Sequence, residues 1–357
     1  MNKKLLIAAV GAALVAGPMM AAQAAPTVYG SFHMSLDRYD VDSSASATTE
    51  RGLLNSNSSR FGIKGDEDLG GGLKSIYQVE GGVFNADDGT GGTAGTNGFG
   101  AQLRNTYLGF SGSSWGMVKF GRHDTPVKDL GRAVDLFNEQ IGDARNVIGN
   151  LGVFDARVSN MVRYDSPDFS GIKFALQYGT PEATGSTRYT SGNGTWTSGP
   201  IMLGLGYEKH SFGSSALKDE NDIRLVGKFT IGDLSLAALY ETMNDLAGVS
   251  SADRKAWGLG AGFKLANNLL KAQYYNTDKV DGQATENGGT IWALGVDHSF
   301  SKTTMVYANY ATASNDGGTT AFNVSSSSGG HGTTNQPLVG KAGGDSTAYS
   351  LGTIIKF

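Results

Sequence analysis

Residues 256–264 read Ala-Trp-Gly-Leu-Gly-Ala-Gly-Phe-Lys, with large apolar side chains at alternate positions and mostly small ones between them. Successive side chains of a strand point to opposite faces, so a period of two predicts a strand whose two faces differ. The same alternation recurs around Phe174, Ile201, Ile223, Trp292 and Tyr349. The sequence therefore predicts an all-β fold.

The connections between the predicted strands differ sharply in length. Residues 232–233 and 266–268 form tight turns, whereas 40–57, 85–102, 124–156 and 313–345 are long and polar. Aromatic side chains lie near the strand ends, and the last strand finishes on Phe357. A soluble β-sandwich also shows alternation. Short turns on one side, long loops on the other and aromatic girdles are typical of an outer-membrane barrel.

We expect sixteen strands, an even number that places both ends of the barrel on the periplasmic side. Their predicted ranges are 27–39, 58–66, 72–84, 103–112, 115–123, 157–166, 171–179, 186–196, 200–210, 221–231, 233–243, 255–265, 269–278, 290–300, 302–312 and 346–357. No linker or change of composition divides them, so we expect one domain over 25–357.

The first 24 residues predict a secretory signal peptide. Residues 1–4 are basic, 5–16 are apolar or small, and 22–24 form a small-x-small cleavage site. The apolar run is shorter than the about 20 residues that a spanning helix needs. We therefore expect residues 1–24 to direct export, and the barrel to reach the cell outer membrane.

Composition limits the chemistry that the chain can perform. It contains no Cys, which excludes disulfides, thiolate metal sites and Cys nucleophiles. The 29 Lys and Arg are outnumbered by 33 Asp and Glu, which argues against a nucleic-acid partner. The His residues show no metal-ligand spacing, and the Asp-containing turns at 87–89 and 315–317 lack a full calcium ligand set. We expect no metal and no cofactor.

Several motifs resemble one known family. They are 27–30, 59–74 with its glycine-rich turn, 77–80, 119–122, 160–171 and the terminal Phe357. In these segments the chain resembles the general diffusion porins of the Gram-negative outer membrane, of the neisserial and betaproteobacterial type. The resemblance implies a sixteen-stranded antiparallel transmembrane β-barrel that assembles as a homotrimer. It also implies an inward-folded third loop and a role for Phe357 as a membrane-assembly signal.

Strand parity selects basic side chains for the lumen. Arg60 alternates with Phe61 and Ile63, so its side chain is expected to point inward. In similar porins, arginines at the positions of Arg60, Arg104 and Arg157 form a basic cluster on the barrel wall. The expected basic wall of the pore constriction comprises Arg60, Arg104, Arg157, Lys74 and Arg122.

The third long connection, 124–156, is expected to supply the opposite charge. It contains a short helical stretch over 127–138 and several carboxylates. Carboxylates on an inward loop, opposite wall arginines, would set up a field across the narrowest point of the pore. The expected acidic side comprises Glu80, Asp129, Asp135 and Glu139.

We therefore expect a passive channel for inorganic ions and small hydrophilic solutes, surrounded by outer-membrane lipid and weakly anion-preferring because of its wall arginines. A solute-specific porin is the first alternative. An outer-membrane enzyme has less support, because Ser35 lies near His33 but no Gly-x-Ser-x-Gly elbow is present. An exported adhesin would not explain the unequal connections.

Overall fold

The computed structural model describes residues 25–42, 49–82, 103–183, 185–319, 321–325, 331 and 339–357. Residues 1–24, where a signal peptide is predicted, lie outside the described residues, as do 43–48 and the whole of the expected loop 85–102. In the described ranges, no helix is both long enough and apolar enough to cross a membrane.

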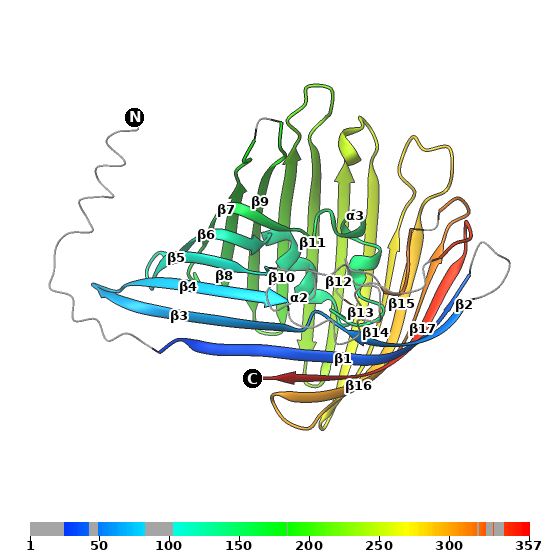
Figure 1. The fold of residues 1–357 in the computed structure, drawn as a ribbon, viewed down its shortest axis with the longest axis horizontal. Helices are drawn as coiled ribbons and strands as arrows, with labels where there is room; N and C mark the ends of the chain where they lie inside the picture. Colours follow the sequence, from blue (N-terminus) through cyan, green and yellow to red (C-terminus); the bar gives the residue numbers. More distant parts are fainter. Residues whose placement is uncertain are drawn as a thin grey trace, which may run out of the picture.

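The described residues form seventeen strands in one antiparallel sheet that closes on itself (Figure 1). From β3 onward each strand pairs with the next, and β1 closes the ring by pairing with β17 on one side and with β2 and β3 on the other. The strands are β1 (Thr27–Val41), β2 (Thr49–Ser56), β3 (Arg60–Gly70), β4 (Leu73–Gly82), β5 (Thr106–Gly112), β6 (Gly116–Asp124), β7 (Arg157–Asp165), β8 (Ile172–Gly179), β9 (Arg188–Ser198), β10 (Ile201–Ser211), β11 (Glu220–Ile231), β12 (Leu234–Asn244), β13 (Arg254–Leu265), β14 (Asn268–Thr277), β15 (Gly289–Ser299), β16 (Thr304–Asn315) and β17 (Asp345–Lys356).

Strands β2 and β3 are two parts of one barrel strand. Both pair with β1, and they are separated only by residues 57–59, where Ser58 has a positive φ of 53°. The backbone N–H of Asn57 donates to the His33 carbonyl oxygen at 2.8 Å, so the interruption stays bonded to β1. The barrel is therefore sixteen-stranded and closed, as predicted.

The expected long connection over 40–57 is wrong in extent, because β2 occupies residues 49–56. Its outward Leu54 is exposed, whereas its inward Asn55 is buried and donates to Asp37 and to the Tyr39 hydroxyl. Leu53, which packs against the core, and the exposed Leu54 are adjacent apolar residues on opposite faces, so β2 does not show the apolar alternation that marked the other strands.

The outer face of the barrel is apolar. Its large exposed side chains include Leu108, Phe120, Leu205, Leu225, Leu259 and Leu351. Near one edge, aromatic rings continue from strand to strand, with ring-centre distances of 5.4 Å for Trp257–Tyr274, 5.1 Å for Trp292–Tyr310 and 4.9 Å for Tyr310–Tyr349. A row of this kind marks the level of a membrane interface. A closed sheet also leaves no unpaired backbone edge in hydrocarbon.

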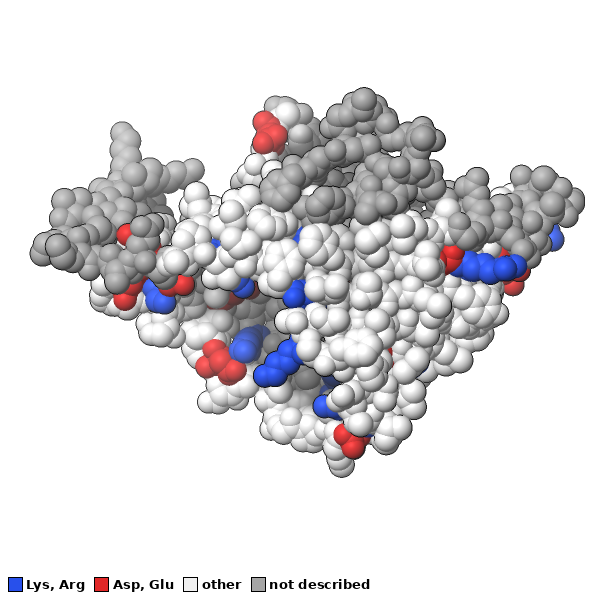
Figure 2. Space-filling view, turned by 60° about the horizontal axis from the view of Figure 1, so that its bottom comes forward, with Lys and Arg blue, Asp and Glu red and all other residues white. Residues whose placement is uncertain are grey.

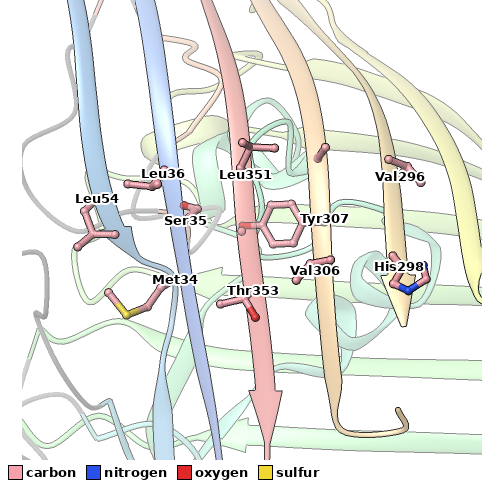
Figure 3. A pocket seen from close by; sticks show the side chains of 12 residues that line it. Met34, Ser35, Leu36, Leu54, Val296, His298, Val306, Tyr307, Leu351 and Thr353 are labelled. Atoms are coloured by element: carbon pink, nitrogen blue, oxygen red, sulfur yellow. The ribbon is translucent and has the colours of Figure 1, made fainter. Parts of the chain in front are cut away.

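A shallow groove of about 490 Å³ lies on this outer face, over β1, β16 and β17 (Figure 3). Its lining includes Met34, Leu36, Leu54, Val306 and Leu351. These side chains share the outward parity of their strands, so the groove faces away from the lumen.

The interior of the barrel is partly filled by residues 125–156, which join β6 to β7. This segment, called here the inward segment, contains α2 (Pro126–Val134), the short η1 (Ala144–Asn146) and α3 (Gly149–Gly152). Figure 1 shows α2 and α3 within the ring of strands. Thr125 caps α2 by accepting from the Lys128 N–H, and Pro126 occupies the first turn, where its missing N–H carries no penalty.

The hydrophobic core lies inside the barrel, between the inward segment and the wall. Phe137, Ile141, Val147 and Phe154 are fully buried there. Beside larger residues such as Leu239, Met243 and Tyr275, the wall opposite them presents several small residues: Ala237, Ala256, Gly260, Ala293, Gly295, Ala311, Ala313 and Ala348. Since these residues leave space on the inner face of β12–β17, the segment can approach the strands closely.

The closest approach occurs at Gly142, which has a φ of +81°. A Cβ atom at this position would lie 2.5 Å from the Cβ of Ala293 and 3.1 Å from that of Ala311. The position therefore needs glycine for two reasons, the left-handed backbone and the contact with the wall.

We predict that Gly142→Ala destabilises the barrel more than Gly232→Ala does. Gly232 also has a positive φ, of +56°, but a Cβ there would meet no atom within 4 Å. The two variants share the backbone penalty, so the difference isolates the wall contact, for which overpacking costs about 1–3 kcal/mol. Urea unfolding of both variants in lipid measures it, and equal midpoints would contradict close packing at Gly142.

Candidate functional site

A group of charged side chains lies where the inward segment faces the opposite wall, and Glu139 is at its centre. The Glu139 carboxylate accepts from Arg60 at 2.8 Å, from Arg132 at 3.1 Å and from Arg104 at 3.4 Å. Arg60 begins β3, Arg104 precedes β5, and Arg132 belongs to α2. The Glu139 carboxylate is thus held by two arginines of the wall and by one arginine of helix α2.

Glu80, near the end of β4, extends the group along the wall. Its carboxylate accepts from Arg104 Nε at 2.8 Å and from the Tyr29 hydroxyl at 2.9 Å. The backbone N–H of Arg104 also donates to the Glu80 carbonyl oxygen at 2.8 Å. These contacts fix Arg104 in place although it lies outside a strand.

Asp124, at the end of β6, joins the other members. It accepts from Arg157 at 3.0 Å, from Arg132 at 3.0 Å and from Lys128 at 3.1 Å. Asp124, Lys128 and Arg132 are spaced by four residues, which places side chains on one face of a helix. The Nε of Arg157 also donates to Asn105 Oδ1 at 2.8 Å.

Among the described residues, this constriction network joins five cations to three carboxylates, which leaves an excess of two positive charges. Its members are Arg60, Arg104, Lys128, Arg132, Arg157, Glu80, Asp124 and Glu139. The Arg60 and Arg132 side chains are 25% and 23% exposed, whereas those of Glu139 and Asp124 are 12% and 2% exposed. The lumen is therefore in contact mainly with guanidinium groups.

The space-filling view shows where charged side chains gather on one face of the molecule. Figure 2 shows a hollow whose edge carries Lys and Arg side chains, with Asp or Glu side chains beside some of them.

Burial and neighbouring charge set the protonation of the inward segment. Burial alone would raise the pKa of Glu139, but Arg60, Arg104 and Arg132 together hold it well below its usual range. Burial lowers the pKa of Lys128 to about 8, against the attraction of Asp124. Burial, together with the nearby Asp143 carboxylate, raises the pKa of Asp135 to about 7.

The structure brings Arg60, Arg104, Arg157, Glu80 and Glu139 into this network and leaves four other predicted residues outside it. Lys74 pairs with Asp66 at 2.8 Å near the turn between β3 and β4, where both side chains are exposed. Arg122 has the parity of the exposed Phe120 and donates to the Leu103 carbonyl oxygen and to Ser159 Oγ.

The two remaining carboxylates belong to other parts of the inward segment. Asp129 pairs with Arg163 of β7 at 2.7 Å. Asp135 accepts from Gln273 of β14 at 2.8 Å and from the backbone N–H of Phe137 at 2.9 Å. Asp135 therefore fastens the segment to the wall instead of facing the arginines.

Two sets of residues were missed by sequence reasoning. Arg132 and Lys128 are absent from the expected basic wall, although their spacing of four residues from Asp124 beside a helical stretch could have indicated them. The second set is the anchor of the segment to β11 and β12, where Arg224 contacts Asp155 at 2.9 Å and Glu241 at 2.7 Å. Tertiary folding creates this contact, so no local pattern indicated it.

The site offers no arrangement for metal chemistry in the part of the chain that the structure describes, where no three His, Asp or Glu side chains group as ligands. Its arginines and carboxylates already satisfy one another in ion pairs. The arrangement can orient and select charged solutes by electrostatics.

Comparison with known proteins agrees with this geometry. The family model described as Gram-negative porin matches residues 7–318. Outer membrane porin protein 32 of Delftia acidovorans is 30% identical over 335 residues, which cover 88% of this chain and 90% of that protein. An outer membrane porin of Bordetella pertussis is 28% identical over 302 residues, covering 75% and 74%.

Solved structures show the same architecture. The anion-selective porin from Comamonas acidovorans superposes with a TM-score of 0.77 at 25% identity, over 93% of this chain and 99% of that one. The family match, the relatives and the closed barrel together make the protein a passive channel of the outer membrane. By its sequence and its fold, this chain belongs to the Gram-negative porin family.

Proposed function

We propose that the constriction network makes this channel weakly anion-preferring. The observation that carries the proposal is the excess of two positive charges among its described members, with guanidinium groups more exposed than carboxylates. A fixed ring of charge attracts mobile ions of the opposite sign and repels those of the same sign. The narrow, low-dielectric surroundings focus that field.

The preference is expected to be weak because the carboxylates remain close to the cations. Glu139 neutralises part of the charge of Arg60, Arg104 and Arg132 at distances of 2.8–3.4 Å. Salt screening reduces the remaining field further, since the Debye length is about 8 Å at physiological ionic strength. An anion-selective porin among the related structures supports the sign of the proposal.

The proposal includes no catalysis, no metal and no cofactor, and a solute-specific porin remains the alternative.

We further propose a homotrimer, export directed by residues 1–24, a single barrel domain over 25–357, and a role for Phe357 in membrane assembly. Phe357 lies where the ends of β1 and β17 meet, and its backbone exchanges hydrogen bonds with Gly30. Chemical cross-linking of the protein in lipid tests the trimer.

The sign of the preference is measured by the reversal potential of refolded channels in a KCl gradient. Wild type should reverse on the chloride side, and Arg60→Ser and Arg157→Ser should each move the potential toward zero, because each removes one exposed cation from the network. Lys74→Ser removes the same charge from an exposed ion pair at a turn, so it serves as the matched control and should leave the potential almost unchanged.

Cation preference in wild type would overturn the proposed selectivity while leaving the channel intact. Equal effects of Arg60→Ser and Lys74→Ser would show instead that total lumen charge, and not this network, sets the preference. Heat-modifiable migration on gels verifies that each variant has folded before its potential is interpreted.

Alkaline pH should weaken the anion preference with a midpoint near pH 8. Lys128 is charged below its pKa of about 8 and neutral above it, so the network loses one positive charge on going from pH 7 to pH 9. Arginine stays protonated in proteins, so Lys128→Arg should abolish this step and keep the preference at pH 9. A step of unchanged size in Lys128→Arg would assign the titration to another group.

A further inference from the structure

The connection between β16 and β17 contains a second element that enters the lumen. Of this connection the structure describes residues 316–319, 321–325, 331 and 339–344. Phe322 and Val324 are almost completely buried, 0% and 1% exposed, in the same core as Phe137 and Ile141 of the inward segment. Apolar side chains of an extracellular connection are thus covered inside the barrel.

Residues 321–325 bind the inward segment through its backbone and an amide side chain. The Val324 carbonyl oxygen accepts from the Gly142 N–H at 2.7 Å and from Asn146 Nδ2 at 3.0 Å. Gly142 and Asn146 stand on either side of the turn that follows Glu139. One carbonyl group therefore fixes both ends of that turn.

The same residues are fastened to the barrel wall. The Phe322 N–H donates to Asn315 Oδ1 at 2.8 Å, and Asn315 Nδ2 donates to the Phe322 carbonyl oxygen at 2.9 Å. The Val324 N–H donates to Ser346 Oγ of β17 at 3.0 Å. Residues 321–325 thus transmit the position of β16 and β17 to the inward segment.

Glu139 has a backbone conformation that requires such support. Its φ is +63°, in the left-handed region that costs a non-glycine residue about 1–3 kcal/mol when the surroundings enforce it. The Glu139 N–H donates to Asp143 Oδ2 at 2.7 Å, and the Nδ1 atom of His331 lies 3.3 Å from the Glu139 carbonyl oxygen. His331 in turn contacts Asp37 of β1 at 2.8 Å.

We propose that residues 321–325 are a positioning element of the constriction, which holds Glu139 against Arg60 and Arg104 by fixing the turn at Gly142–Asn146. Asn315 and Phe322 act through that turn and touch no permeating solute. The inference rests on the proposed constriction network and adds a second connection of the barrel to it.

The test compares Asn315→Ala, which removes both hydrogen bonds to Phe322, with Asn276→Ala. Asn276, at the end of β14, bonds only its neighbour Asp278 among the contacts described and serves as the matched control. We expect Asn315→Ala channels to show a higher single-channel conductance and a reversal potential further on the chloride side, because a released turn widens the pore and withdraws the Glu139 carboxylate from the arginines whose charge it neutralises. Asn276→Ala should retain both values.

Phe322→Ala should act in the same direction as Asn315→Ala, and Phe322→Leu should restore most of the wild-type behaviour. If Phe322→Ala fails to fold, Asn315→Ala still decides the question. Repeating the Asn315→Ala measurement in a Glu139→Gln background distinguishes positioning of the Glu139 charge from a purely structural role. If positioning of the Glu139 charge is the cause, Asn315→Ala should shift the reversal potential much less in that background.

Folded Asn315→Ala channels that conduct and reverse as wild type would overturn the proposal. A fully additive double variant would also overturn it, because the two residues would then act independently. Failure of the proposed anion preference is recognised separately, from the wild-type reversal potential alone, and conductance in Asn315→Ala still reports whether residues 321–325 hold the constriction.

Discussion

The position of the inward segment depends on small side chains at the points where it meets the barrel wall. Alanines such as Ala237, Ala293 and Ala311 leave room for the segment on the inner face, beside larger buried residues such as Tyr275 and Met243. Gly142 comes so close to Ala293 and Ala311 that a methyl group added at Gly142 would force the segment away from the wall. The segment lies on this wall, and its Glu139 pairs with Arg60 and Arg104 across the lumen. The ion-pair network therefore depends on small side chains at one wall as well as on charges at the other.

The two sides of the inward segment have different tasks. One side carries Phe137 and Ile141 into the core and presents Asp135 to Gln273, so it binds the wall. The other side carries Glu139 and Arg132 toward the wall arginines. A carboxylate placed beside several guanidinium groups keeps its charge and reduces their mutual repulsion. The cations can then remain exposed to the lumen without unfolding the segment, which explains why a channel with a net positive constriction still contains a buried Glu139.

The period of two is a local property, so parity alone placed Arg60 inward. The pairing of β6 with β7 is irregular between Gly121 and His123, and Arg122, which lies between them, has outward parity. For the inward segment, composition indicated carboxylates, but the direction of each one depends on which wall it touches. Glu139 faces the arginines, whereas Asp129 and Asp135, with the same chemistry, face β7 and β14. Strand β2 was missed because Leu53 and Leu54, on its two faces, are both apolar and break the period of two.

Packing and charge contribute differently to holding the segment. Burial of apolar side chains is not directional. Apolar contact alone would therefore leave the position of the inward segment along the strands poorly defined. Arg224 removes that freedom: it is fully buried and contacts Asp155 of the segment and Glu241 of β12, whose carboxylate also accepts from the Gly149 N–H at 2.6 Å. A buried ion pair adds little net stability compared with apolar packing, but a displaced partner leaves an uncompensated charge. The apolar wall therefore keeps the segment inside the barrel, and Arg224 determines where along the wall it stops, which in turn sets the place of Glu139.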